Sequence, residues 1–262
     1  MLAAVPQGEA APGRFRHHFE VICMLNILLA GYLLVVAPAI SLWRSRHQRG
    51  NKPEASLASR YWSMSWKVLV LLTLLWLGAR EAGYTATQLG FDMPVSRAGT
   101  WGLVFAPLLL GGIALASVIS ERRQTPEGRI ELERKALASP FPWPRTRMEV
   151  LGFAVSITLM SAAWEILYRG FLLLLLTPHI GLPMAIVASA LAYGLAHGYE
   201  NPQQLLGSIV AAFIFTLAYA LTHSLWWLIA IHAGLPLSAL PAAMRALRRR
   251  AARQSDAMRQ EA

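Results

Sequence analysis

The sequence has little charge and almost no cysteine. Of its 262 residues, 15% are charged and 55% are hydrophobic, and the mean hydropathy is +0.43. Soluble domains usually carry about 25% charged residues, so this composition argues against a soluble globular enzyme and excludes a disordered chain. The single cysteine, Cys23, excludes a disulfide scaffold. The sequence instead indicates an all-α, polytopic integral membrane protein, because helices satisfy their own backbone hydrogen bonds inside a bilayer.

Long segments with few or no charges occur along the whole chain. A membrane-spanning helix needs about 20 mostly apolar residues, and the sequence predicts about seven such segments, with six or eight as alternatives. They are 21–43, 62–84, 98–120, 150–176, 183–199 and two more within 201–244, divided by a turn near His223 and Ser224. We expect the first to be retained as a span, because it is too long for the apolar part of a signal peptide. Breaks are expected at Thr177-Pro178 and at 181–183.

Basic residues are unevenly distributed between the expected loops. With seven spans, 19 of the 24 lysines and arginines fall on one side of the membrane, in 44–67, 121–147 and the C-terminal tail, and four fall on the other. Lysine and arginine are enriched in short cytoplasmic loops. We therefore expect a multi-pass protein of the cell (inner) membrane, with its N-terminus outside and its C-terminus in the cytoplasm.

Three regions are expected along the chain. Residues 1–147 form an N-terminal region of three spans with basic loops and an interfacial linker, residues 148–244 form a core with the candidate site, and residues 245–262 form a basic tail. In the linker, the helical spacing of Glu127 and Glu131 predicts a short interfacial helix.

The arginine-rich loops and the tail, with its run 248–250, are expected to contact anionic lipid headgroups. Binding to nucleic acid is not expected, because neither a nucleic-acid-binding fold nor aromatic residues interleaved with the arginines accompany them.

Two charged residues lie inside the expected span 150–176. Glu165 and Arg169 are four residues apart, which places them on one face of a helix and within reach of each other. Ionisable side chains inside a span are costly, so each marks a candidate site. The pair has two interpretations, which are a structural ion pair between helices and a part of a functional site.

Two histidines lie in later spans. His197 follows Tyr193 by four residues, Glu200 lies one turn further, and His232 is in the last span. A lone histidine on an apolar helix is more often a satisfied core group than a catalyst. The combination with Glu165 favours a site, because no comparable set occurs in the first three spans. A carboxylate and imidazoles that face one cavity could activate water and polarise a carbonyl group.

Three short motifs lie on successive apolar segments of the core. They are WEILYRG at 164–170, YGLAH at 193–197 and HAGLP at 232–236. In this order they resemble the EExxxR, FxxxH and HxxxN or HxxxD motifs of the CAAX-protease and bacteriocin-processing family of intramembrane glutamic endopeptidases. The resemblance covers about residues 148–240.

The resemblance implies a metal-independent endopeptidase without a cofactor, which hydrolyses a peptide bond of a peptide or protein substrate in a membrane-embedded cavity. Carried over by motif position, Glu165 is the second glutamate of the first motif and Arg169 is its arginine. His197 is then the histidine that helps to activate water, and His232 the one that stabilises the oxyanion. Tyr193, Trp164 and Glu200 are expected to support the site.

Tyr193 replaces the phenylalanine of the second motif, and two further departures bear on catalysis. Trp164 stands where the family has its first glutamate, and Pro236 stands where it has asparagine or aspartate. An indole cannot act as a base, and a proline donates no hydrogen bond. The sequence therefore leaves two hypotheses open, which are an active intramembrane protease and a catalytically silent relative that acts as a scaffold, immunity protein or processing accessory.

Two further alternatives follow from the residues alone. In a transporter, Glu165 and Arg169 would form a gate, but the first three spans contain no matching charged pair. In a metallohydrolase, Glu165, His197 and His232 would be zinc ligands, although the sequence has no HExxH motif. Substrate and oligomeric state are not indicated by the sequence.

Overall fold

The computed structural model describes residues 24–47, 56–138, 143–144, 146–197 and 201–260. Within these ranges every regular element is a helix, and six helical segments are long and apolar enough to cross a membrane. The expected all-α, polytopic membrane protein is thereby confirmed.

The helices follow the expected spans closely. The first described helix runs from Met24 to His47 and contains a π-helical segment, η1, before α2. The elements in chain order are η1 (Tyr32–Val36), α2 (Ala37–His47), α3 (Leu57–Ala82), α4 (Arg97–Arg123), α5 (Pro126–Ala138), α6 (Arg147–Glu165), η2 (Ile166–Leu172), α7 (Leu173–Ala196), α8 (Pro202–Thr222) and α9 (Trp226–Gln260). Helix α5 is the short helix predicted in the linker, and the turn predicted near His223 separates α8 from α9.

One candidate segment, 147–196, is long enough to cross the membrane twice. Its 50 residues would extend about 75 Å as a straight helix, against an apolar core of about 30 Å. The chain turns back at Gly181, whose φ of 74° and ψ of 155° are not helical. The hydroxyl of Ser189 consequently lies 2.7 Å from the carbonyl oxygen of Tyr168 on the preceding element. Counted as two spans because of this turn, the segment brings the six candidates among the described residues to the seven spans expected from the sequence.

The break expected at Thr177-Pro178 is not present. Helical backbone angles continue through Pro178, and the first non-helical residue is Gly181. Proline is tolerated within membrane helices because neighbouring groups satisfy the freed backbone. The expected division of the core from the tail at residue 244 also falls inside α9, which continues as one helix to Gln260.

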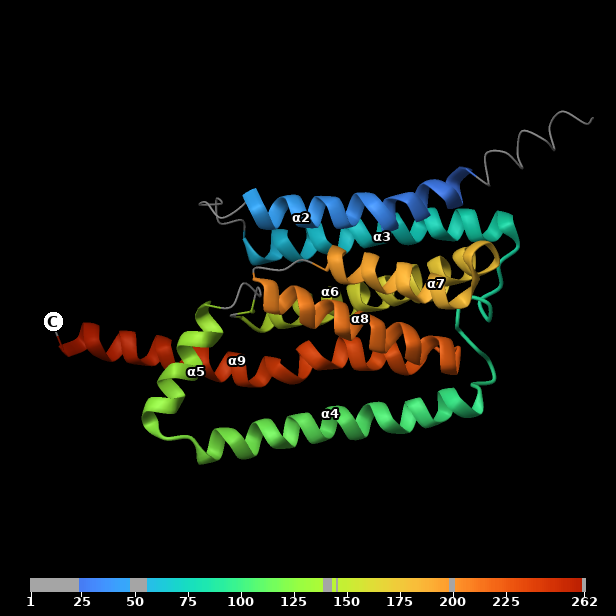
Figure 1. The fold of residues 1–262 in the computed structure, drawn as a ribbon. Helices are drawn as coiled ribbons and strands as arrows, with labels where there is room; N and C mark the ends of the chain where they lie inside the picture. Colours follow the sequence, from blue (N-terminus) through green and yellow to red (C-terminus); the bar gives the residue numbers. More distant parts are fainter. Residues whose placement is uncertain (1–23, 48–55, 139–142, 145, 198–200, 261–262) are drawn as a thin grey trace, which may run out of the picture.

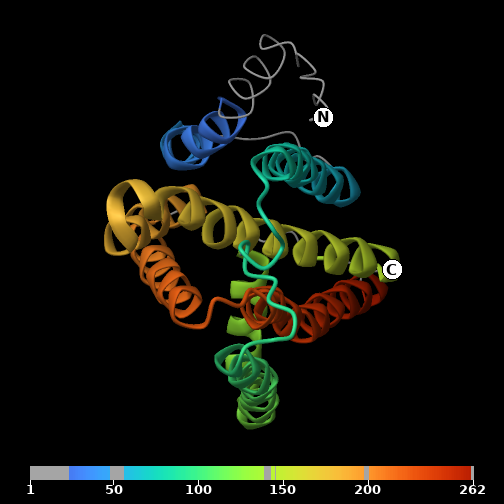
Figure 2. The same cartoon turned by 90° about the vertical axis from the view of Figure 1, so that its right-hand side faces the viewer.

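The helices lie nearly side by side, with α2 and α3 along one edge of the bundle and α4 along the other (Figure 1). Viewed from the end, α6, α7, α8 and α9 surround the middle of the molecule, and the segment between α3 and α4 crosses this end (Figure 2). Helix α3 packs on α6, and α4 packs on α9. The N-terminal helices therefore support the core that carries the three motifs.

Small and polar residues join the helices, as expected where lipid supplies no hydrophobic drive between them. The amide of Asn26 donates to the carbonyl oxygen of Gly78 at 3.3 Å, and the hydroxyl of Ser65 donates to that of Ser156 at 2.9 Å. Gly194 lets α7 approach α8, since a Cβ there would lie 2.8 Å from the Cα of Ile209. This close approach holds the end of α7 against α8, where the site is built.

The C-terminal part of α9 is joined to α4 by ion pairs. Arg245 and Arg249 each place a guanidinium nitrogen 2.7 Å from the carboxylate of Glu121. Helix α5 also packs against α9. The basic end of α9 and the linker helix thus lie at the same end of the bundle (Figure 1).

Candidate functional site

The first motif lies where the helix widens. Helix α6 ends at Glu165, and the π-helical segment η2 follows directly with Arg169 inside it. A π turn leaves backbone carbonyls without their usual helical partners, and such turns are frequent at functional sites. The carbonyl oxygen of Tyr168 accepts the hydroxyl of Ser189, while the hydroxyl of Tyr168 donates to the carbonyl oxygen of Leu33 in η1 at 3.0 Å. Contacts between helices therefore stabilise the irregular turn that presents Arg169.

Glu165 and Arg169 form a buried ion pair. Nη1 of Arg169 lies 3.4 Å from Oε1 of Glu165, and both side chains are 0% exposed. The Nη2 atom of Arg169 also donates to the carbonyl oxygen of Ala212 on α8, at 3.4 Å. In such a buried pair, each charge compensates the cost of burying the other. Glu165 is therefore a carboxylate that points toward the interior of the bundle.

His232 connects this carboxylate to α7. Its Nδ1 atom lies 2.7 Å from Oε1 of Glu165, and its Nε2 atom lies 3.1 Å from the hydroxyl oxygen of Tyr193. Because Glu165 is an acceptor only, Nδ1 carries the proton and donates it, and Nε2 is left to accept the hydroxyl hydrogen of Tyr193. Three elements, α6, α9 and α7, thus supply a continuous chain of Glu165, His232 and Tyr193.

The ring of Tyr193 lies against charged and aromatic neighbours. The guanidinium carbon of Arg169 stands 4.0 Å from its centroid, which is a close cation–π contact. The ring of His197 is 5.3 Å from that of Tyr193 and 6.2 Å from that of His232, measured between centroids. The two histidines therefore stand on opposite sides of a gap between α7 and α9.

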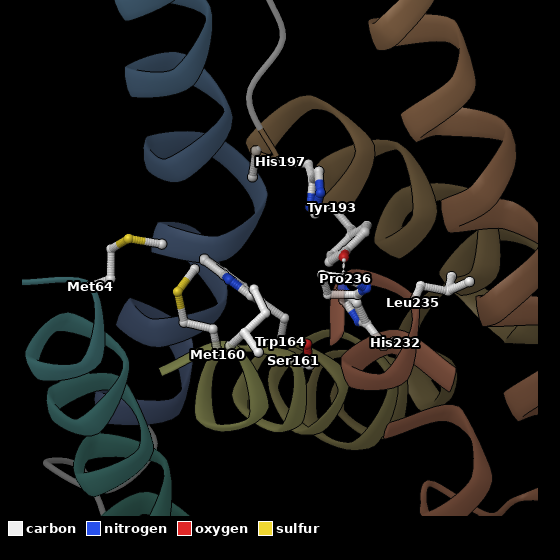
Figure 3. A pocket seen from close by; sticks show the side chains of 11 residues that line it. Met64, Met160, Ser161, Trp164, Tyr193, His197, His232, Leu235 and Pro236 are labelled. Atoms are coloured by element: carbon white, nitrogen blue, oxygen red, sulfur yellow. Dashed lines mark hydrogen bonds between the residues drawn. The ribbon is translucent and has the colours of Figure 1, made fainter. Parts of the chain in front are cut away.

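Two cavities open at this gap. One, the Met-lined cavity, has a volume of about 550 Å³ and is bounded by Met64, Met160, Ser161, Trp164 and Pro236 among others. The other, the α8-side cavity, has a volume of about 400 Å³ and is bounded by Gln204, Ser208, Ala211 and Phe215 among others. Tyr193, His197, His232 and Leu235 belong to both linings. Figure 3 shows the hydroxyl of Tyr193 directed at His232, with Trp164 and Met160 across the cavity.

The two departures from the motifs both lie in the Met-lined cavity. Trp164 and Pro236 are part of its lining, and both are partly buried. Glu165, the neighbour of Trp164, is fully buried and does not contribute to the lining of either cavity. Among the described residues, those with polar side-chain atoms that line both cavities are Tyr193, His197 and His232.

The structure brings together most of the residues that the sequence singled out. Glu165, Arg169, Tyr193, His197 and His232 lie around one gap, and Trp164 lines the cavity beside it. The hydrogen bond that Glu165 makes joins it to His232, on α9. Glu200 lies outside the described residues.

Some features of the site carry no clear sequence signal. The backbone carbonyl of Ala212 binds Arg169, and Phe215 lies 5.9 Å from both the Arg169 guanidinium carbon and the His232 ring centre. Met64 reaches the cavity from α3, which precedes the motif region by about a hundred residues in the chain. Only the packing of α3 and α8 on the core brings them there.

The geometry also bears on the metal alternative. In the part of the chain that the structure describes, no three histidine, cysteine, aspartate or glutamate side chains are grouped so that they could hold a metal ion. Both nitrogens of His232 already have partners. The set of Glu165, His197 and His232 is therefore not arranged as a ligand set.

Comparison with known proteins finds a family match in the motif region. No curated protein and no solved structure matches the chain. Residues 146–237, which contain all three motifs, match the family model described as type II CAAX prenyl endopeptidase Rce1-like. The resemblance that the motifs suggested is thereby confirmed for this segment, which is similar to the Rce1-like endopeptidases over residues 146–237.

Proposed function

We propose that this protein is an intramembrane, metal-independent endopeptidase that cleaves a peptide or protein at the membrane. The observation that carries the proposal is the hydrogen bond between Glu165 and Nδ1 of His232, whose Nε2 lies at the gap shared by the two cavities. A buried carboxylate that holds one ring nitrogen and directs the other at a cavity is the arrangement that makes histidine a general base.

Charge explains why His232 is suited to this role. Glu165 is compensated by Arg169, so the resting site is neutral when His232 is neutral. When His232 takes a proton, the new positive charge lies 2.7 Å from the carboxylate of Glu165, which stabilises it. Glu165 thus acts through His232 as a positioning residue, and Arg169 keeps Glu165 ionised.

The reaction follows from this arrangement. A water oxygen attacks the carbonyl carbon of the peptide bond, one proton of the water passes to Nε2 of His232, and the electron pair of the carbonyl bond moves to the oxygen. The oxyanion then reforms the carbonyl group, the C–N bond breaks, and the leaving amine takes the proton from Nε2. The products are a carboxylic acid and an amine, and His197, across the gap from His232, donates a hydrogen bond to the oxyanion.

This proposal exchanges the roles that the motifs imply for the two histidines. The resemblance pairs Glu165 with His197 for water activation and leaves His232 for the oxyanion. The hydrogen bonds favour the reverse, because Glu165 is bonded to His232 and a neutral His232 that donates from Nδ1 has no second proton for an oxyanion. His197, at the end of α7, is exposed and lines the cavity. Among the described residues, no hydrogen bond to a carboxylate uses the N–H of its ring.

The distribution of charge along the bundle supports a location and an orientation in the membrane. We propose that it lies in the cell membrane with the N-terminus outside and the C-terminus in the cytoplasm, since α5 and the basic end of α9 lie at one end of the bundle. His197, which directly follows α7, then stands toward the cytoplasmic side. Exposed arginines at this end, such as Arg122, Arg123 and Arg248, would contact anionic lipid.

A second candidate function is that of a catalytically silent relative, which acts as a scaffold, immunity protein or processing accessory. One observation favours it: Trp164 and Pro236 line the Met-lined cavity where the motifs have a carboxylate and a side-chain hydrogen-bond donor. In this case the chain of Glu165, His232 and Tyr193 serves only to hold α6, α7 and α9 together.

A comparison of membrane proteomes separates the two. Cells that produce the wild-type protein, no protein, Glu165→Gln or His232→Ala are compared for new protein termini. A protease predicts a set of termini that appears with the wild type and is lost in both variants at equal protein level. Arg245→Ala, at the surface ion pair with Glu121, is the control and should retain the termini. A set of termini that does not depend on Glu165 and His232 supports the silent candidate.

A further inference from the structure

We infer that the hydroxyl of Tyr193 covers the base in the free protein and becomes the second hydrogen-bond donor to the oxyanion when substrate binds. The inference rests on the proposed function and assigns a catalytic role to a residue that the motifs give none. Its basis is the position of one oxygen atom between His232 and the two cavities.

The hydroxyl of Tyr193 contacts the ring of His232 directly. The hydroxyl oxygen of Tyr193 is 3.1 Å from Nε2 of His232, the nitrogen that the proposed mechanism uses as a base. Since Nδ1 donates to Glu165, Nε2 has a lone pair and no hydrogen, and the Tyr193 hydroxyl donates to it. In the free protein the lone pair is therefore occupied, and Tyr193 competes with any water for it.

The third motif has no hydrogen-bond donor at its last position. The third motif ends at Pro236, which lines the Met-lined cavity and has neither a side-chain donor nor a backbone N–H. The second motif begins with a tyrosine where phenylalanine is usual, and that tyrosine lines both cavities. The third motif thus lacks its side-chain donor at position 236 on α9, and the second motif carries an additional one, Tyr193 on α7, in the lining of the same cavity.

The two functions of the hydroxyl are linked. A substrate carbonyl oxygen in the gap accepts the hydroxyl hydrogen of Tyr193, which releases Nε2 of His232 to accept a proton from water. As Nε2 becomes protonated it can no longer accept from Tyr193, so the hydroxyl hydrogen remains on the developing oxyanion. The hydrogen bond therefore strengthens as negative charge develops on the oxygen. An interaction that is stronger in the transition state than in the bound substrate lowers the activation barrier.

The surroundings of the ring favour this role. The guanidinium carbon of Arg169 lies 4.0 Å from the centroid of Tyr193, so a positive charge lies over the ring of the phenol that donates. The ring also packs edge-on against Tyr168 at 5.3 Å. Both contacts hold the ring in place, and only the hydroxyl hydrogen has to change its partner.

The experiment compares wild type, Tyr193→Phe and the control Tyr219→Phe as full-length protein in lipid nanodiscs. Tyr219 is another buried tyrosine, on α8, outside the linings of both cavities. Each protein is treated with diethyl pyrocarbonate, which acylates unprotonated imidazole nitrogen, and the rate at His232 is read by peptide mass spectrometry with His179 as internal reference. Thermal unfolding of each variant reports on the fold.

We expect His232 of Tyr193→Phe to react several-fold faster than in wild type, relative to His179, while Tyr219→Phe reacts as wild type does. A purely structural tyrosine predicts no selective change at His232. Equal rates in wild type and Tyr193→Phe, including no reaction in either, overturn the inference, provided that Tyr193→Phe unfolds at the wild-type temperature. If its unfolding temperature is lowered, Tyr193→His, which retains a ring donor, is tested in addition and must return the rate toward wild type.

The catalytic part of the inference is tested on the substrate that the terminus comparison identifies. We expect kcat of Tyr193→Phe to fall by about 10²-fold with little change in KM, as for loss of one oxyanion donor. Adding Pro236→Asn, which supplies a donor from α9, should recover part of this loss. If wild type cleaves and Tyr193→Phe cleaves equally fast, the inference fails while the proposed function stands. If wild type cleaves nothing, the proposed function fails, and the acylation rates still report whether Tyr193 covers His232.

Discussion

Oε1 of Glu165 lies 2.7 Å from Nδ1 of His232 and 3.4 Å from Nη1 of Arg169, so one carboxylate oxygen contacts both an imidazole ring and a guanidinium group. Glu165 and Arg169 are fully buried, whereas the side chain of His232 is 19% exposed. The ion pair is therefore shielded from solvent, whereas the histidine bonded to it lines a cavity. In the proposed mechanism, stability and catalysis both depend on the carboxylate of Glu165. Variants of Arg169 test its part in stability, and variants of His232 test its part in catalysis.

Arg169→Ala should destabilise the protein. It leaves the Glu165 carboxylate buried without its cation, and removal of one partner of a buried pair typically costs about 3–5 kcal/mol. Thermal unfolding in detergent measures the change. Arg245→Ala removes an arginine from the partly exposed pair with Glu121 and should cost under about 1 kcal/mol. If Arg169→Ala unfolds at the wild-type temperature, the ion pair does not stabilise the fold.

Sequence reasoning could predict the helices and the ion pair because both depend on local features. Apolar runs place the spans within a few residues, and the spacing of Glu165 and Arg169 fixes their proximity on any helix. Of the two breaks expected between the fourth and fifth spans, the one at 181–183 is confirmed at Gly181, whereas Pro178 is accommodated within the helix. The extent of α9 was also not predicted, because the basic pattern after residue 244 indicates a tail but contains no residue that ends a helix.

The partner of Glu165 could not be read from local features. His197 and His232 are 32 and 67 residues away in the chain, and which of them meets the carboxylate depends on how α7 packs on η2 and α9 on α6. Glycines at the helix contacts, such as Gly194, set these distances. The resemblance assigned roles by motif order, whereas the hydrogen bond between Glu165 and His232 is a property of the packed bundle.

Kinetics of single and double variants should distinguish the two assignments of the histidines. In our account Glu165→Gln and His232→Ala each abolish water activation, so their effects on kcat should not add. His197→Ala removes one oxyanion donor and should leave activity that is about 10²–10³-fold lower but measurable. The assignment implied by the motifs predicts the reverse, with residual activity in His232→Ala and non-additive loss in Glu165→Gln with His197→Ala.

Reporter fusions should place the two ends of the chain on opposite sides of the membrane. With the seven spans that we propose, the basic residues lie mainly on the cytoplasmic side, so a reporter active only in the cytoplasm should work at the C-terminus and fail at the N-terminus. Fusions after residue 124, between α4 and α5, should behave like the C-terminal fusion. An inactive C-terminal fusion at normal protein level contradicts the orientation and the number of crossings.

Chelators should not reduce cleavage. The ring nitrogens of His232 are bonded to Glu165 and Tyr193, so a metal ion could bind His232 only after one of these hydrogen bonds is broken. We expect the rate of purified protein to be the same before and after treatment with 1,10-phenanthroline, followed by metal analysis of the sample. A loss of activity that zinc restores would show that His232 is a ligand and exclude it as the base.

The central claim is that Glu165 and His232 together activate water for peptide hydrolysis, and incorporation of oxygen from water tests it most directly. Wild type, Glu165→Gln, His232→Ala and the control Arg245→Ala are reconstituted in nanodiscs and incubated in H₂¹⁸O with the substrate found by terminus mapping. The account predicts one ¹⁸O atom in the new C-terminal carboxyl group for wild type and Arg245→Ala, and no product for the other two. Labelled product at the wild-type rate from folded Glu165→Gln or His232→Ala would contradict it.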